Sequence, residues 1–74
     1  MILRRLEEST LPVQAIDLTI DGYTSETISY HCGLLMDELL IEAVKEQNNR
    51  MAFADYKVIK ITSAGHDYLD TLPG

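Results

Sequence analysis

The sequence is poor in cysteine and tryptophan and has no long hydrophobic run. Its 74 residues include one cysteine and no tryptophan, and a single cysteine excludes a disulfide framework within the chain. Polar or charged residues interrupt every apolar segment well short of the about 20 residues that a membrane helix needs. No signal-peptide pattern is present. We therefore expect a cytoplasmic protein that does not enter a membrane.

The core of a chain this short is too small to accommodate a deep pocket as well. A domain of this length buries only about 60% of the surface of its unfolded chain, and conformational entropy cancels most of the hydrophobic gain. A deep substrate cleft would consume that core. The 46% hydrophobic content excludes a disordered tail. The sequence thus predicts one domain over residues 1–74 that is not an enzyme and holds no cofactor.

Basic residues are missing from a long central segment. Residues 7–44 contain eight acidic residues and no Lys or Arg, within a chain of net charge −6. A polyanion could therefore approach only the N-terminus or residues 45–60. An acidic balance of this size is also typical of a small soluble domain. The basic side chains are Arg4, Arg5, Lys45, Arg50, Lys57 and Lys60.

Hydrophobic periodicity predicts the first half of the fold. Residues 1–8 form a short helix with one apolar stripe, Ile2, Leu3 and Leu6. Residues 13–21 alternate between apolar and polar side chains, which indicates a half-buried strand. Thr24 or Ser25 caps a long helix over about residues 25–38. We expect Ile28, Cys32 and Leu35 to face the core with His31 at the edge, and Glu26, Ser29, Tyr30, Gly33 and Asp37 to face outward.

The second half reads as a hairpin followed by a helix. Residues 41–62 contain two strand-forming segments around the polar loop Gln47-Asn48-Asn49-Arg50. Thr62 or Ser63 caps the last helix, whose expected inward side chains are Ala64, Tyr68, Leu69 and Leu72. A long helix before a hairpin, with the strand at 13–21 in the same sheet, predicts an α+β fold. This fold is a winged helix with an incomplete helix-turn-helix, three helices and a small antiparallel sheet.

Two segments resemble bacterial winged-helix regulators. The segment Thr27–Ile41 is similar to their recognition helix, and Ile61–Leu69 resembles the motif that closes their wing. A second resemblance, over about residues 1–72, is to a family of small uncharacterised, phage-associated bacterial proteins with a winged-helix fold. It is carried by Gly22-Tyr23, by Tyr30-His31 with Leu34-Leu35, and by Gly65-His66 with Leu69-Asp70. Two positions depart from the regulators. Leu39 stands where the regulators have glycine, and a left-handed backbone at this residue would cost about 1 kcal/mol of stability. The predicted strand over residues 13–21 stands where the regulators have a supporting helix.

The resemblance implies a nucleic-acid surface on the long helix and the wing. Phosphate contacts need Lys or Arg, which the outward face of the helix lacks. The wing carries more of them, although its loop is equally typical of a polar hairpin tip. The candidate contacts to double-stranded DNA are Ser25, Glu26, Ser29, Tyr30, Lys45, Asn48, Asn49, Arg50, Lys57 and Lys60.

Metal binding and catalysis find little support. His31 and Cys32 are adjacent on a helix and diverge by about 100°, so they share a metal poorly, and we expect His31 and His66 to be structural. Ser63, His66 and Asp70 have triad residue types but no visible oxyanion hole. We interpret Ser63 as a helix cap.

Two functions remain open at this point. The one that the commonest use of the fold favours is a DNA-binding transcriptional regulator of phage or prophage origin, with weak affinity. The other is a protein-interaction module that keeps the architecture without binding DNA. We also expect a homodimer through the terminal helices, because Leu39, Leu40, Tyr68 and Leu72 offer more apolar surface than one thin layer can cover.

Overall fold

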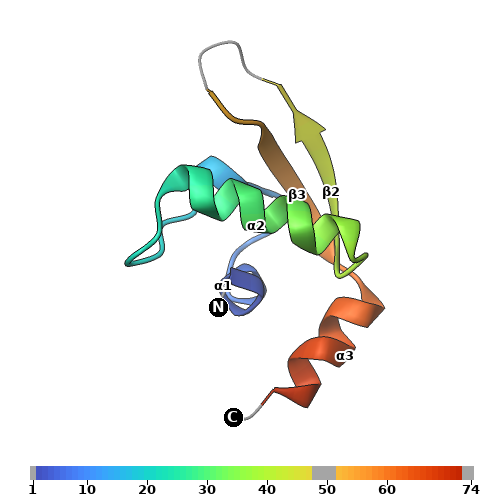
Figure 1. Ribbon diagram of the computed structural model, residues 1–74. Helices are drawn as coiled ribbons and strands as arrows, with labels where there is room; N and C mark the ends of the chain where they lie inside the picture. Colours follow the sequence, from blue (N-terminus) through green and yellow to red (C-terminus); the bar gives the residue numbers. More distant parts are fainter. Residues whose placement is uncertain (1, 48–51, 73–74) are drawn as a thin grey trace.

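The computed structural model describes residues 2–47 and 52–72. Within these ranges three α-helices and three strands follow one another, with a short 3-10 helix after the first strand (Figure 1). Their order and composition confirm the predicted α+β class. The elements are α1 (Ile2–Glu7), β1 (Val13–Gln14), η1 (Ala15–Asp17), α2 (Ser25–Asp37), β2 (Ile41–Glu46), β3 (Asp55–Ile61) and α3 (Ser63–Thr71).

The three strands form one antiparallel sheet with β3 in the middle, between β1 and β2. The β2–β3 ladder runs from Ile41 opposite Ile61 to Glu46 opposite Asp55, so the predicted hairpin is confirmed. A bulge shifts the register between Glu42 and Ala43 and leaves Ile59 without an opposite residue.

The predicted strand over residues 13–21 is wrong beyond its first two residues. β1 pairs with β3 only at Val13 and Gln14, and the chain then turns into η1. The reason is a side chain far along the sequence: the Asp55 carboxylate accepts the N–H of Ile16 at 3.2 Å, so this N–H does not extend the ladder. The turn brings Ala15 and Leu18 to the core and leaves Ile16 37% exposed.

The core lies between α2, the sheet and the short N-terminal helix. α2 crosses one face of the sheet, and α1 lies beside it in contact with both α2 and α3 (Figure 1). A helix of six residues is not stable by itself, and α1 is held by burying Ile2, Leu3 and Leu6 as predicted. Other fully buried side chains are Ile28, Cys32, Ile41 and Val58.

The last helix packs with one edge only. Thr62 is its cap, accepting the N–H of Gly65 at 3.0 Å, so the role interpreted for Ser63 is wrong. Leu69 is buried and Leu72 is half-buried, as predicted, but Ala64 and Tyr68 are exposed. The expectation for these two side chains fails because the main contacts of α3 are with α1 and β3, which leave much of its surface exposed. No helix in the described part of the chain is long and apolar enough to span a membrane.

Candidate interaction surface

The N-terminal end of α2 is placed by a side-chain cap. The hydroxyl of Thr24 accepts the N–H of Thr27 at 3.1 Å, which selects Thr24 over Ser25 as the cap. Ser25 and Glu26 therefore lie in the first turn, exposed to solvent. The negative charge of Glu26 is favourable near the positive end of the helix dipole.

Two side chains expected on the outer face of α2 are buried instead. Ser29 is 1% exposed, and its hydroxyl has no hydrogen-bond partner among the residues that the structure describes. Gly33 is buried against β3, since a Cβ atom on it would lie 2.8 Å from the Tyr56 hydroxyl oxygen. The prediction failed because α2 packs on η1 and on both hairpin strands, which covers more than one stripe of the helix. Ser29 is therefore removed from the candidate DNA contacts.

The C-terminal end of α2 carries backbone strain. Leu39 has φ of 61°, which confirms the left-handed backbone considered for this position. The N–H of Leu40 donates to the carbonyl of Leu35 and the N–H of Leu39 to that of Met36, both at 3.0 Å. These two bonds form the Schellman motif, which normally takes glycine at the strained position. The Leu39 side chain is 73% exposed, so no burial offsets the strain.

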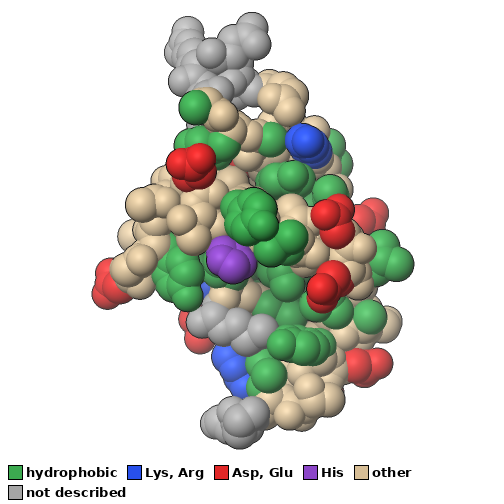
Figure 2. Space-filling view, viewed as in Figure 1, with side chains coloured by type: hydrophobic (Ala, Val, Ile, Leu, Met, Phe, Trp, Pro, Cys, Tyr) green, Lys and Arg blue, Asp and Glu red, His purple; other side chains and the backbone are tan. Residues whose placement is uncertain are grey.

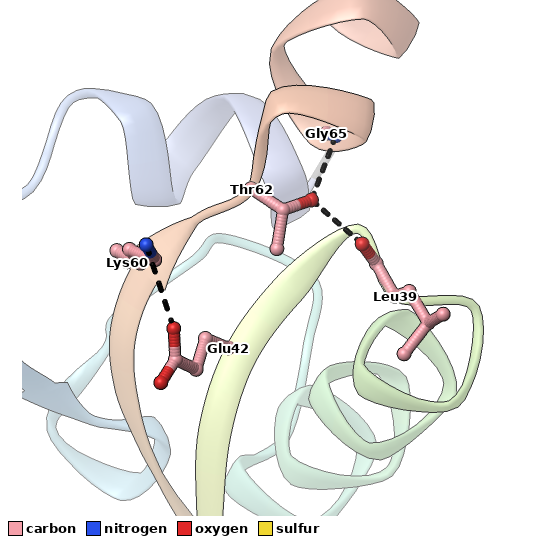
Figure 3. Close-up of polar contacts among 5 residues, drawn as sticks. All are labelled: Leu39, Glu42, Lys60, Thr62 and Gly65. Carbon is pink, nitrogen blue, oxygen red and sulfur yellow. Dashed lines mark hydrogen bonds and ion pairs between the residues drawn. The ribbon is translucent and has the colours of Figure 1, made fainter.

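Thr62 connects this end of α2 to α3 (Figure 3). Its hydroxyl donates to the Leu39 carbonyl at 2.6 Å while it accepts from Gly65, and its own N–H donates to the carbonyl of Leu40 at 3.1 Å. Gly65 fits closely here, because a Cβ atom would meet the Leu40 carbonyl oxygen. Figure 3 also shows the Lys60–Glu42 ion pair at 3.6 Å. Both of its side chains are more than half exposed, so it adds little stability.

An apolar groove of about 460 Å³ runs between α1 and α2. Tyr23, just before α2, lies at its edge and is 44% exposed, and Leu34 on α2 is 41% exposed. The ring of His31 makes edge-on contacts with Tyr23 and Tyr30, at centroid distances of 6.4 and 5.8 Å. The groove is lined by Ile2, Leu3, Tyr23, His31, Leu34, Leu35 and Glu38.

The surroundings of the groove are acidic. Figure 2 shows hydrophobic side chains gathered over α2 with acidic side chains around them, while Lys and Arg lie at two separate places on this face. Among the described residues, the lining includes one carboxylate, Glu38, and no Lys or Arg. Asp37, beside it, is exposed. In α1, Arg5 donates to the Ser9 hydroxyl at 2.7 Å.

The lysines of the hairpin do not form one patch. Lys45 stands opposite Tyr56, and Tyr56 faces α2 through Gly33, so Lys45 lies on the α2 side of the sheet. Neighbouring residues of a strand point to opposite faces. Lys57 therefore lies on the other face, with the Lys60–Glu42 pair.

The candidate DNA contacts are thus only partly brought together. Glu26 and Tyr30 of α2 line a hollow of about 170 Å³ with Phe53, Ala54 and Tyr56 of the hairpin. Tyr30 is 63% exposed there. Lys57 and Lys60 are on the far face of the sheet, and Asn48, Asn49 and Arg50 lie outside the described residues.

Cys32 is fully buried beneath this surface. Burial, and secondarily the negative charge of Asp55, raises the pKa of its thiol to about 11. A thiol with this pKa is almost entirely protonated at neutral pH and is a poor nucleophile. Cys32 is therefore a core residue rather than a reactive one.

The groove itself was missed by the sequence argument. Its α1 wall, Ile2 and Leu3, was predicted as core only, and Leu34 was named only as part of a family motif. The available signal was Leu34, which lies next to Leu35 on the helix and makes the apolar face wider than one buried stripe requires.

These features define the chain as a small α+β domain whose long helix presents an apolar groove and an acidic face. A family model described as hypothetical protein (DUF2513) matches residues 1–73, and the chain belongs to that family. The chain matches no curated protein and no solved structure.

Proposed function

We propose that this chain is a protein-interaction module with a winged-helix-like arrangement, which uses the α2 side of the molecule and does not rely on nucleic acid. The observation that carries the proposal is the composition of that side. It exposes Tyr23, Tyr30 and Leu34 among acidic residues, and α2 has no Lys or Arg. Aromatic side chains are enriched at protein interfaces, whereas phosphate binding needs positive charge.

The arrangement of elements supports the winged-helix part of the proposal. A long helix precedes a two-stranded hairpin, and a short N-terminal strand pairs with the second hairpin strand. The three-residue η1 stands where a helix-turn-helix has its supporting helix. With only three residues in place of a supporting helix, α2 is held less rigidly for insertion into a DNA groove. This favours a module that binds a protein partner.

A duplex titration tests this function. Fluorescence anisotropy with a labelled random duplex should give no detectable binding at about 50 mM salt, because the acidic α2 repels phosphates. The variant Glu26→Lys with Asp37→Lys should gain measurable affinity. Glu7→Lys with Glu8→Lys makes the same charge change on and just after α1 and should gain less. Nanomolar binding by the unmodified protein, or equal gains in both variants, would contradict the proposal.

A weak DNA-binding regulator of phage or prophage origin is the second candidate. The hollow shared by Tyr30 and the hairpin favours it, with Lys45 on the same side of the sheet. With three or four phosphate contacts, log affinity should fall against log salt with a slope of about −3, and the dissociation constant should be about 10⁻⁴–10⁻⁶ M at physiological salt. Arg50→Ala should reduce this slope by about one unit. Ser29→Ala should leave it unchanged.

A further inference from the structure

The lining of the α1–α2 groove has the spacing of a helix-binding stripe. His31, Leu34, Leu35 and Glu38 are at positions i, i+3, i+4 and i+7 of α2 and just past its end, so they follow one line along the helix. Ile2 and Leu3 of α1 form the opposite wall. The 13 residues of α2 extend over about 20 Å, the length of about three and a half helical turns.

The groove is open rather than enclosed. Tyr23 and Leu34 each keep more than two-fifths of their surface in contact with solvent while they line it. A small molecule is normally bound in a pocket that covers most of its surface. An open apolar stripe instead accepts the apolar face of an amphipathic helix, whose anchors repeat at the same spacing.

The charges specify the partner further. Glu38 lines the groove and Asp37 is exposed next to it. No Lys or Arg lies between positions 7 and 44, and Arg4 and Arg5 of α1 are not among the described residues that line the groove. A partner helix with Lys or Arg beside its apolar face would meet opposite charge at the rim. A second copy of this chain has a net charge of −6 and would bring acidic residues against acidic residues.

From the spacing, the openness and the charge, we propose that the α1–α2 groove binds a basic amphipathic helix of another protein. This inference rests on the proposed protein-interaction function and names its partner class. The apolar face of the partner lies on Leu34, Leu35 and the α1 wall, and its cations lie near Glu38 and Asp37. Tyr23 and His31 close the end of the groove nearest the start of α2.

The test uses the full chain and three synthetic peptides. The probe is a peptide of about 14 residues, long enough for about 21 Å of helix, made of Leu on one face and Lys on the other. A second peptide has the same composition in scrambled order and no apolar face, and a third replaces Lys with Glu. The probe should bind with micromolar affinity and shift the NMR amide signals of residues 31–38 and of α1. Both other peptides should bind at least about tenfold more weakly.

Two matched variants distinguish binding in the groove from non-specific electrostatic attraction of the basic peptide to an acidic protein. Leu34→Asp adds a negative charge inside the groove, whereas Val44→Asp adds the same charge at a 52% exposed position on β2, on the far face of the sheet. Electrostatics alone would make both variants bind the basic probe more tightly. The proposal instead requires Leu34→Asp to weaken binding at least about tenfold and Val44→Asp to leave it unchanged or slightly tighter. Leu34→Ala, a smaller change, should weaken binding less.

Circular dichroism confirms that each variant is folded before titration. Equal binding by Leu34→Asp and Val44→Asp, equal binding of the scrambled peptide, or amide shifts confined to the hairpin would overturn the inference. A dimer that dissociates in Leu34→Asp would overturn it as well, because a second copy would then occupy the groove. If neither the basic peptide nor the DNA duplex binds, the proposed partner class is wrong and the protein-interaction function stands. Tight duplex binding would remove that function instead.

Discussion

Leu39 holds a backbone conformation that suits glycine, and it does so at the surface. Its positive φ is required by the Schellman motif that ends α2. An L-residue in this conformation loses about 1–2 kcal/mol, and the 73% exposed side chain recovers little of it by burial. The conformation is held by the hydrogen bonds of this motif and by the Thr62 hydroxyl on the Leu39 carbonyl, and Leu39 directly follows Glu38, which lines the groove.

Replacement of Leu39 by glycine should stabilise the protein. Removing the backbone strain outweighs the added entropy of the unfolded chain, so Leu39→Gly should raise the free energy of unfolding by about 0.5–1 kcal/mol. Urea denaturation measures this difference. Leu39→Ala is the control, since it removes the side chain and keeps the strain. An equal gain in Leu39→Ala would place the cost in the exposed side chain rather than in the backbone.

The buried thiol of Cys32 should make stability fall at alkaline pH. Its pKa is about 11 in the folded protein against 9.0 for an unperturbed cysteine, so folding favours the protonated thiol. This contribution is complete below about pH 9 and is lost as the pH rises toward 11, by about 2–3 kcal/mol in total. Urea unfolding at pH 8, 9, 10 and 11 measures it. Cys32→Ala should show a shallower decline, and an identical decline would assign the effect to other groups.

At the scale of elements, hydrogen bonds of Thr62 connect the end of α2 and the residue before β2 to the beginning of α3. Thr62 bonds to Leu39 and Leu40 through its hydroxyl and its N–H, and it caps α3. Gly65 allows α3 to approach the Leu40 carbonyl. These contacts fix the direction in which α3 leaves the sheet, beside α1.

The two helical glycines should respond differently to alanine. Gly65→Ala places a methyl group against the backbone oxygen of Leu40, which cannot move freely, and should lower the free energy of unfolding by at least about 2 kcal/mol. Gly33→Ala meets only the end of the Tyr56 side chain and gains about 1 kcal/mol of helix propensity, so its net change should be small. Urea denaturation of both variants checks this. Equal losses would show that the fit at Gly65 does not depend on backbone contact.

At the scale of the whole molecule, the net charge of −6 acts against self-association while exposed apolar side chains favour it. Of the four side chains expected at a dimer interface, Leu39 and Tyr68 are exposed, whereas Leu40 and Leu72 are half-buried. Two of the four are therefore available for a contact between copies.

We predict a weak homodimer through the terminal helices, tighter at high salt because salt screens the repulsion between acidic surfaces. Sedimentation velocity at high micromolar concentration measures it. Tyr68→Glu should abolish the dimer, and Leu34→Asp should leave it intact because Leu34 on α2 is not among the side chains expected at the dimer interface. A strict monomer at every salt concentration would contradict the prediction.

The sequence by itself determined the elements whose signals are local. The change from a two-residue to a 3.6-residue period near Gly22, the cap residues of α2 and α3, and the polar segment after β2 located the long helix and the hairpin within a residue or two. The apolar stripe of α1 identified its core side chains. Such signals depend on neighbours in the chain, so they are readable without the fold.

Only the tertiary structure decided the features that depend on distant partners. Residues 15–17 alternate as a strand would, but the carboxylate of Asp55 takes the N–H that a longer strand would use. The helical periodicity of α2 places Ser29 and Gly33 on its outward, polar face, yet η1 and β3 cover that face as well. The groove exists because α1 and the C-terminal half of α2, about 30 residues apart in sequence, pack side by side with apolar surface left uncovered. Periodicity reports which face of a helix is apolar, and only the packing of the other elements determines how much of that face remains exposed.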